Sequence, residues 1–439
     1  MSESHSSEPI GSQVARPESS SRRRFLQESS AVLVGGTLAA TLGSARSVHA
    51  AGSDIIKVGL IGCGGRGSGA AVNAIRAGSD IRIVALADAF EDRLKHCRNL
   101  ITRQEPKQFV VPDDQCFVGF DSYKQLLECD VDVVLLCSPP HFRPAHLRAA
   151  IEANKHVFCE KPVAVDPTGI RSVLETTEMA KQKNRIIVSG LCWRYDYSVR
   201  ATIDQIQQGA IGDIVAIQEN YLTGTLWHRG RQPEWSEMEY QMRNWLYYTW
   251  LSGDHIVEQH VHSLDKAMWL MGDKPPLRCF GLGGRQVRTD EQWGQIYDHF
   301  AICYEWATGQ KVFAFTRQMA GCHNDVDDYV LGTKGRAEIL RNKIDGETKW
   351  RYEGPKPSMY DVEHKELFEA LREGRVINNG EYMSYSTLLA IMGREACYTG
   401  HSITWEEAMA SKQDLTPAAY TWGDVETIPV ATPGKTTFA

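Results

Sequence analysis

The chain has 439 residues, of which 42% are hydrophobic and 23% are charged, proportions typical of a soluble globular protein with room for two separate cores. Its formal net charge is −7, and no basic stripe follows residue 60, which argues against a nucleic-acid-binding or anionic-membrane-binding surface. The expected partner is therefore small and neutral or weakly charged.

The first fifty residues form a predicted export signal. Residues 21–27, Ser-Arg-Arg-Arg-Phe-Leu-Gln, match a twin-arginine box, and a weakly apolar run follows at 31–42. That run is too short to span a bilayer, and residues 48–50 offer a small-residue cleavage site, so the mature chain is expected to start at Ala51 without a membrane segment. This predicts a folded protein in the periplasm or another extracytoplasmic space. The alternative is a basic, Ser-rich tail.

The eleven cysteines do not predict disulfides, although the chain is expected to be exported. Their number is odd, and they are scattered from Cys63 to Cys397 without a C-x-x-C pair. Several lie in apolar, strand-like runs, which predicts buried free thiols.

Short apolar runs alternate with amphipathic stretches up to about residue 190. The runs predict strands at 57–61, 81–87, 131–137, 156–159 and 185–188. Intervening stretches such as 122–127 and 144–153 carry apolar residues at helical spacing. Right-handed crossovers would join these units into a doubly wound parallel sheet, a Rossmann domain over residues 51–190.

After residue 191 the pattern changes to one more helical segment and then to longer, alternating strands. These strands are expected at 214–221 and in two hairpins, one joining 297–306 to 311–317 and one within 329–340 around residues 332–335. Such hairpins predict a mostly antiparallel open sheet with helices on one face, an α+β domain over residues 191–439.

A G-x-G-x-x-G turn closes the first predicted strand, with its glycines at Gly62, Gly64 and Gly67. A tight turn, close approach to a pyrophosphate and close helix packing require glycine at these positions. Asp88 ends the next strand, 21 positions beyond Gly67, where ribose hydroxyls would lie. The acid favours NAD as the cofactor, while Arg93 nearby keeps NADP possible.

The fourth predicted strand runs into Cys159-Glu160-Lys161-Pro162. A charged pair at the carboxyl end of a parallel strand lies where open α/β sheets bind ligands. The alternative is a solvated ion pair on a loop.

With these motifs the chain resembles the glucose-fructose oxidoreductase, inositol dehydrogenase and MocA (Gfo/Idh/MocA) family. The likeness rests on the glycine turn, Ser138-Pro139-Pro140-His141, residues 160–162 and the segment 253–265, and it covers nearly all of the predicted mature chain. It implies hydride transfer between a nicotinamide cofactor and a sugar, polyol or cyclitol, in a homodimer or homotetramer associated through the second-domain sheet. The cofactor-binding residues it implies are Gly62, Gly64, Gly65, Arg66, Gly67, Asp88, Ser138, Pro139, His141, Glu160 and Lys161.

The same resemblance implies a catalytic triad of Lys161, Glu258 and His262. Glu258 stands where the family usually has Asp, and His260 replaces a customary Gly. Oxidation of an alcohol needs a base for the hydroxyl proton, a role that suits His262. Lys161 would stabilise charge on the same oxygen, and Glu258, one helical turn before His262, would orient the imidazole ring.

Two other interpretations of this segment remain open. His255, Glu258 and His262 share one helical face, as metal ligands do, but H-x-x-E-x-x-x-H matches neither common zinc motif, so no metal is expected. A solvated polar helix face is the second alternative, since Asp265 continues the stripe.

Aromatic and basic residues at two places suit a carbohydrate pocket. One cluster, 193–197, follows the fifth strand, and the other, 227–229, follows a second-domain strand. The substrate-binding residues predicted are Arg194, Tyr195, Trp227, His228 and His260. Most aromatic residues between 235 and 250 are expected in the core or an interface instead.

Export has a consequence for the reaction, because little free nicotinamide is available for exchange outside the cytoplasm. A tightly retained cofactor is therefore expected. Retention also permits an alternative, an NAD-dependent glycoside hydrolase or epimerase that oxidises its sugar only transiently. A dinucleotide or sugar sensor without chemistry is the third possibility, which Lys161 and His262 argue against.

Overall fold

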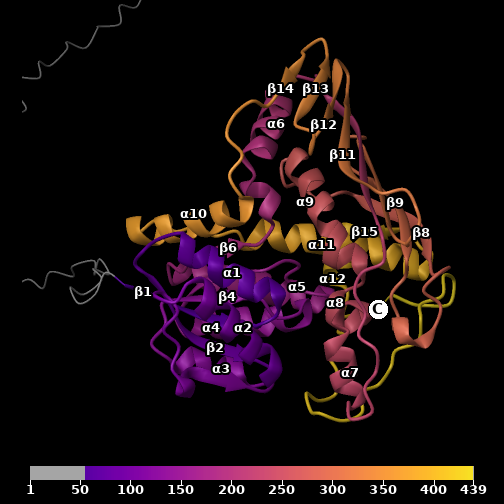
Figure 1. Cartoon of the computed structure of the whole chain (residues 1–439). Coiled ribbons are helices and arrows are strands. Elements are labelled where there is room, and N and C mark those ends of the chain that lie inside the picture. The colour runs from indigo at the N-terminus through magenta and orange to yellow at the C-terminus, as the bar shows by residue number, and fades with distance from the viewer. Residues whose placement is uncertain (1–54, 439) are drawn as a thin grey trace, which may run out of the picture. The chain divides into compact units, whose positions relative to one another are not determined.

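The computed structural model describes residues 55–438 (Figure 1). The predicted twin-arginine box, apolar run and cleavage site lie outside these residues. Within them, the first domain contains a six-stranded, all-parallel sheet in the order β3-β2-β1-β4-β5-β6. Its strands are β1 (Ile56–Ile61), β2 (Ile81–Asp88), β3 (Cys116–Val118), β4 (Val133–Leu136), β5 (His156–Cys159) and β6 (Ile187–Ser189). The Rossmann prediction is confirmed.

Both faces of this sheet are buried, which explains its continuous apolar runs. Val58 and Leu60 of β1 pack into one core, while Ile61 and Leu136 pack into the other. The edge strand β3 was not predicted, because its apolar run is only three residues long, too short to indicate a strand. The covering helices are α1 (Gly65–Arg76), α2 (Glu91–Gln104), α3 (Ser122–Glu128), α4 (Arg143–Glu152) and α5 (Pro167–Gln182).

The second domain is built on a nine-stranded sheet in the order β14-β13-β12-β11-β7-β10-β9-β8-β15. Its strands are β7 (Ile214–Thr223), β8 (Arg278–Gly284), β9 (His299–Glu305), β10 (Lys311–Gln318), β11 (Asp325–Gly332), β12 (Gly335–Glu338), β13 (Lys343–Gly346), β14 (Trp350–Arg351) and β15 (Ile403–Thr404). Only β7 and β10 pair in parallel; the predicted hairpins are β9 with β10 and β11 with β12. The mostly antiparallel sheet is therefore confirmed.

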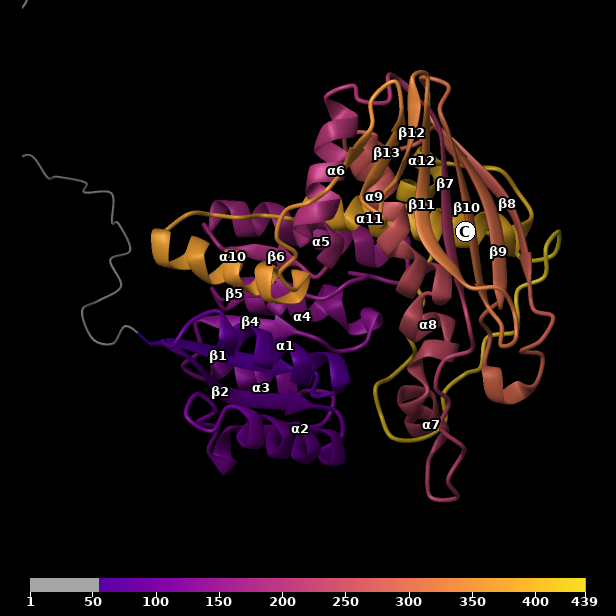
Figure 2. The ribbon, with the colours of Figure 1, turned by 45° about the horizontal axis from the view of Figure 1, so that its top comes forward.

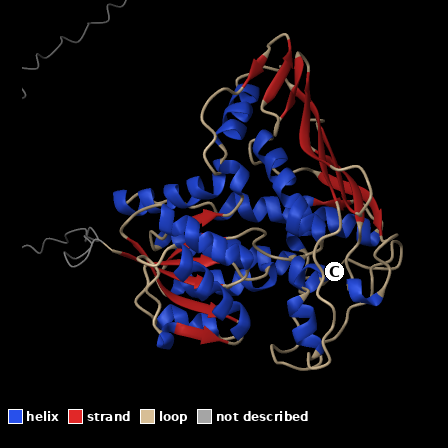
Figure 3. Ribbon diagram, in the orientation of Figure 1, coloured by secondary structure: helices blue, strands red, loops and turns tan. Residues whose placement is uncertain are grey.

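Helices cover one face of this second sheet and leave the other face open (Figure 3). The covering helices are α6 (Tyr197–Gln207), α9 (Val261–Leu270) and α11 (Gly380–Thr399). Leu264 of α9 and Leu388 of α11 share a core with Ile217 and Val312 of the sheet. The short helices are α7 (Glu237–Arg243), α8 (Thr249–Ser252) and α12 (Trp405–Ala410), and an extended segment, 411–438, follows.

One helix of the predicted second domain packs on the first. Helix α10 (Met359–Glu373) lies against α1 (Figure 2), and its Val362, Leu367 and Phe368 join the core around Val58 and Leu60. A single domain boundary at residue 190, as expected from the sequence, therefore does not include α10, which returns to the first domain. The amphipathic pattern of α10 predicts a helix but does not say which sheet the helix covers.

All eleven cysteines are free thiols, and seven of them are buried. The prediction of buried free thiols is confirmed for these seven: Cys63, Cys97, Cys159, Cys192, Cys279, Cys303 and Cys397. Among residues 55–438, no helix has the length and apolar character needed to cross a bilayer.

Candidate active site

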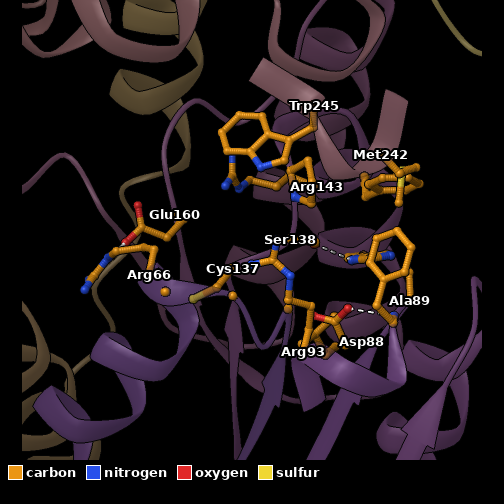
Figure 4. A pocket seen from close by; sticks show the side chains of 18 of the residues that line it. Arg66, Asp88, Ala89, Arg93, Cys137, Ser138, Arg143, Glu160, Met242 and Trp245 are labelled. Atoms are coloured by element: carbon orange, nitrogen blue, oxygen red, sulfur yellow. Dashed lines mark hydrogen bonds and ion pairs between the residues drawn. The ribbon is translucent and has the colours of Figure 1, made fainter. Parts of the chain in front are cut away.

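The main cavity of the described chain, about 620 Å³, opens at the carboxyl ends of β2, β4 and β5 (Figure 4). Ligands bind at this edge of open parallel sheets, and the volume is in the usual range for a binding site. The first domain contributes the glycine turn and the segments after these strands, while Trp227, Trp245, Glu258 and His262 come from the second domain. The cavity therefore has walls from both domains.

The glycine turn has the shape that a pyrophosphate needs. Gly62 has a φ of +96°, and a Cβ there would clash with the backbone of Ser138, while a Cβ on Gly67 would clash with the Gly62 carbonyl. Gly64 and Gly65 line the cavity, and a Cβ on either would meet open space. A phosphate can therefore approach this backbone at the amino end of α1, so the turn fits a dinucleotide.

Arg66 lies beside the turn and is held by two buried carboxylates. Its Nε donates to Glu160, and its Nη2 lies 3.0 Å from an oxygen of Glu363. Its guanidinium also lies 4.9 Å from the ring centre of Tyr360 on α10. Glu160 is buried, so the alternative of a solvated pair on a loop is wrong for it.

Asp88 ends β2 and faces the cavity, as expected for a ribose ligand. Its carboxylate accepts hydrogen bonds from the backbone N–H of Cys63, at 2.6 Å, and of Phe90, at 2.8 Å. Burial raises the pKa of Asp88, and the two backbone bonds act in the opposite direction. Arg93 lines the same end of the cavity.

Ser138 and Pro139 also line the cavity, but His141 does not. His141 is buried, with its Nε2 2.7 Å from the hydroxyl of Tyr420, and burial lowers the pKa of His141 to about 4. The imidazole is thus used in packing against the carboxyl-terminal segment rather than at the cavity surface.

The three residues predicted to be catalytic all line the cavity. Lys161 Nζ lies 2.9 Å from Oε1 of Glu258 and also donates to the Glu258 carbonyl, so an ion pair joins the two domains. Burial, followed by the charges of Lys161 and Lys266, lowers the pKa of His262 well below 6.5. His262 is therefore neutral at pH 7 and able to accept a proton.

The predicted contact between Glu258 and His262 is not formed. Glu258 lies in a π-helical turn, Ile256–His260, that precedes α9, so the two residues do not have the α-helical i, i+4 relation. Among the described residues, Glu258 bonds to Lys161, and Nδ1 of His262 has no hydrogen-bond partner. Glu258 positions the lysine instead of the imidazole.

The alternative metal set is not brought together. His255 is fully buried, bonds through Nδ1 to Asp254 at 2.9 Å and packs against Phe300, away from the cavity lining. In the part of the chain that the structure describes, no group of three or more His, Cys, Asp or Glu side chains could hold a metal ion.

Of the residues predicted to bind substrate, only Trp227 lines the cavity. Arg194 is paired with Asp265 at 2.9 Å and Asp273 at 2.6 Å, outside the cavity lining. Its neighbour Tyr195 is buried and donates to Asn379. The prediction is wrong for both, because partners from distant segments take up their polar groups.

The two predicted histidines also lie outside the lining. His228 follows Trp227, but its Nε2 lies 3.0 Å from the Gln292 carbonyl. His260 is fully buried near Tyr221; neither ring nitrogen has a hydrogen-bond partner among residues 55–438, and burial lowers its pKa to about 3. Their sequence positions beside Trp227 and His262 gave no information on which way each side chain points.

Sequence reasoning missed several residues that line the cavity. They include Phe90, Phe120, Phe142, Arg143, His146, Met242, Trp245 and Tyr360. Phe142 and Arg143 directly follow the predicted segment 138–141, so their place in the sequence could have identified them as lining residues. Nothing in the sequence identified Tyr360, because it reaches the cavity only when α10 packs against the first domain.

Together these features define a two-domain, dinucleotide-binding oxidoreductase. Residues 56–190 match the family described as "Oxidoreductase family, NAD-binding Rossmann fold", and residues 199–338 match the "GFO/IDH/MocA C-terminal domain". The chain belongs to the Gfo/Idh/MocA family, whose members are NAD-binding oxidoreductases that act on sugars and cyclitols. Its first domain is the NAD-binding domain.

Named relatives and solved structures agree with this placement. The chain is 24% identical to a myo-inositol 2-dehydrogenase of Thermotoga maritima, over 64% of this chain and 74% of the relative. It is 25% identical to an inositol 2-dehydrogenase of Acidothermus cellulolyticus, over 76% and 90%. The structure of a levoglucosan dehydrogenase with NADH and levoglucosan superposes with a TM-score of 0.63 at 18% identity, covering 80% of this chain and 99% of that one.

The site predicts a loss of turnover without a loss of cofactor in two variants. Lys161→Met removes the ammonium, and His262→Ala removes the base, so each is expected to lower kcat at least about 100-fold on a sugar that the wild type oxidises. Bound dinucleotide, measured by mass spectrometry of the released cofactor, should stay at the wild-type level. Lys365→Met and His323→Ala, at exposed positions, are the matched controls. Near-normal rates in both site variants would refute the assignment.

Proposed function

We propose that the chain is an NAD(P)-dependent dehydrogenase that oxidises a CH–OH group of a sugar, polyol or cyclitol with a tightly bound cofactor. The observation that carries the proposal is a neutral His262 and the ammonium of Lys161 in the same cavity as the glycine turn. The names of relatives support the substrate class, since they include inositol 2-dehydrogenases and a D-glucoside 3-dehydrogenase of Escherichia coli.

The residues of the cavity can divide the work of alcohol oxidation. NAD, when bound, accepts the hydride from the carbinol carbon. His262 Nε2 can take the hydroxyl proton because the ring is neutral, and Lys161 Nζ can donate to the oxygen as negative charge develops on it. Glu258 keeps the ammonium in place. The rings of Trp227 and Trp245 suit the apolar faces of a pyranose.

Cofactor retention is supported by the carboxyl-terminal segment. Trp422 packs against Phe90 and Phe120, with ring centres 5.1 and 4.5 Å apart, and both phenylalanines line the cavity at the Asp88 end. The segment is tied down before Trp422, where Leu415 N–H donates to Asp166, and after it, where Gly423 accepts from Met238 N–H. A wall supported in this way opposes release of the nucleotide.

A screen of sugars, cyclitols and glycosides with the protein as purified tests the reaction. We expect absorbance of reduced nicotinamide to rise with one substrate class and an oxidised product to accumulate. Free aglycone or an epimer without net redox change would support the hydrolase or epimerase alternative instead. Unchanged substrate in long incubations with an added electron acceptor would contradict an enzymatic role.

Trp422→Ala is expected to release the cofactor faster. Loss of the two ring contacts should increase the rate of dinucleotide loss during dialysis about tenfold, because an aromatic pair contributes up to about 1.5 kcal/mol. Trp350→Ala in β14, on the second sheet, is the control. A wild-type protein that purifies without dinucleotide would contradict retention.

We also propose that two copies associate through the open face of the second sheet. Phe280, Leu282, Phe313 and Phe315 are exposed on this face, between 37% and 78%, whereas the opposite face is covered by helices. An apolar face of this kind suits a symmetric contact with a second copy of the chain.

Leu282→Glu combined with Phe313→Glu is expected to give a monomer, since it places charges within that contact. Light scattering after size-exclusion chromatography measures the mass. Val376→Glu, at an exposed apolar residue outside this sheet, is the control. A wild-type protein that is monomeric at micromolar concentration would contradict the proposal.

Export by the twin-arginine route, to the periplasm or another extracytoplasmic space, is proposed from residues 21–50. Replacing both Arg22 and Arg23 by Lys should keep the full-length protein in the cytoplasm of the expressing cell. Arg24→Lys, beside the pair, should not. Cell fractionation measures both, and periplasmic accumulation of the double variant would contradict this route.

A further inference from the structure

Arg143 lines the cavity with fewer partners than its burial requires. It begins α4 and is only 5% exposed. Its Nη1 donates to the Pro162 carbonyl at 2.5 Å, and Nε has no hydrogen-bond partner among the described residues. No carboxylate within residues 55–438 forms a salt bridge with it. A buried guanidinium with one acceptor for five N–H groups costs free energy unless another acceptor is supplied.

Other buried arginines of the chain are better satisfied. Arg394 bonds to the Glu395 carboxylate, to the carbonyls of Val165 and Gly253 and to Gln413. Arg288 donates to Gln318 and to the carbonyl of Tyr297, although its Nε also has no partner among the described residues. Neither of them lines the cavity. The unused donors of Arg143 therefore coincide with a surface where a ligand can bind.

Arg143 is one of three arginines that line the cavity without a salt bridge among residues 55–438, and Arg93 and Arg229 are the others. Arg66 is offset by Glu160 and Glu363, and Lys161 is offset by Glu258. The bond from Arg143 to the Pro162 carbonyl places its guanidinium at the segment 160–162 that follows β5. In Figure 4, Arg143 and Trp245 lie in the upper part of the pocket, and Asp88 lies in the lower part. The ligand of Arg143 is thus expected near this segment and apart from Asp88.

We propose that Arg143 binds a carboxylate of the substrate, so that the substrate is an acidic sugar such as a hexuronate. The inference rests on the proposed sugar oxidation and narrows its substrate class. The planar guanidinium donates two parallel hydrogen bonds to a carboxylate. Trp227 and Trp245 provide aromatic walls for the sugar ring.

Paired substrates that differ only in the acid group test this inference. D-glucuronate with D-glucose and D-galacturonate with D-galactose are given to the NAD-loaded protein, and kcat/KM is measured from reduced-nicotinamide absorbance. The wild type should prefer each uronate. In Arg143→Gln the ratio of uronate to neutral sugar should fall by about 10- to 150-fold, the usual worth of hydrogen bonds to a charged group. Arg143→Lys should recover part of that ratio.

Several outcomes would overturn the inference. They are a wild type without preference for uronates, an unchanged ratio in Arg143→Gln, and a stronger preference for glucose 6-phosphate than for glucuronate. A loss of bound NAD together with an equal loss on both sugars would assign Arg143 to the cofactor instead. A thermal melt and the cofactor content of each variant identify misfolding, and Arg143→Lys then provides the comparison.

A binding measurement separates this inference from the proposed reaction. If no sugar reduces the cofactor, the dehydrogenase proposal fails, but glucuronate should still quench the tryptophan fluorescence of the NAD-loaded protein with saturation. The dissociation constant should rise at least about tenfold in Arg143→Gln. No quench by glucuronate, or the same constant in the variant, would overturn the carboxylate site itself.

Discussion

The ion pair between Lys161 and Glu258 is the contact on which the site depends. Lys161 follows β5 of the first domain and Glu258 lies in the π-helical turn before α9, yet their charged atoms are 2.9 Å apart, and each side chain is less than 15% exposed. Removing one partner of such a pair leaves an uncompensated charge away from water. The pair therefore fixes the ammonium between the glycine turn and His262, and it couples the geometry of the two domains.

A second network makes the nucleotide end equally dependent on distant parts of the chain. Arg66, in the first turn of α1, pairs with Glu363 of α10, 297 residues later, and also contacts Tyr360. Burial, followed by the charge of Glu160, raises the pKa of Glu363 well above its usual range, and the charge of Arg66 acts in the opposite direction. The motifs of the NAD-binding domain therefore lie in one stretch of the sequence. Its fold, however, also includes α10 from a later part of the chain.

The residues that were predicted correctly from the sequence are those whose roles depend only on their local position in the chain. Gly62 and Gly67 are fixed by clashes that any Cβ would cause, and Asp88 and Lys161 follow from their places at strand ends. The unsuccessful predictions concern the direction of a side chain. Arg194 has the type expected of a sugar ligand, but Asp265, 71 residues away, holds it elsewhere. Arg143 shows the opposite case, a side chain with few partners. The sequence cannot reveal this lack, because it becomes visible only when the positions of all neighbouring residues are known.

In the proposed oxidation, the charge of Lys161 would act both on the base and on the substrate oxygen. Burial and, after it, the charge of Lys161 lower the pKa of His262, which makes the imidazole a weaker base but keeps it unprotonated at neutral pH. In the proposed reaction the same charge would stabilise the alkoxide formed when His262 removes the hydroxyl proton, so the acidity of the substrate would increase as the basicity of the histidine decreases. The two effects offset one another only while Glu258 holds the ammonium within reach of the substrate oxygen. A neutral histidine without that lysine would be available but too weak to ionise an alcohol.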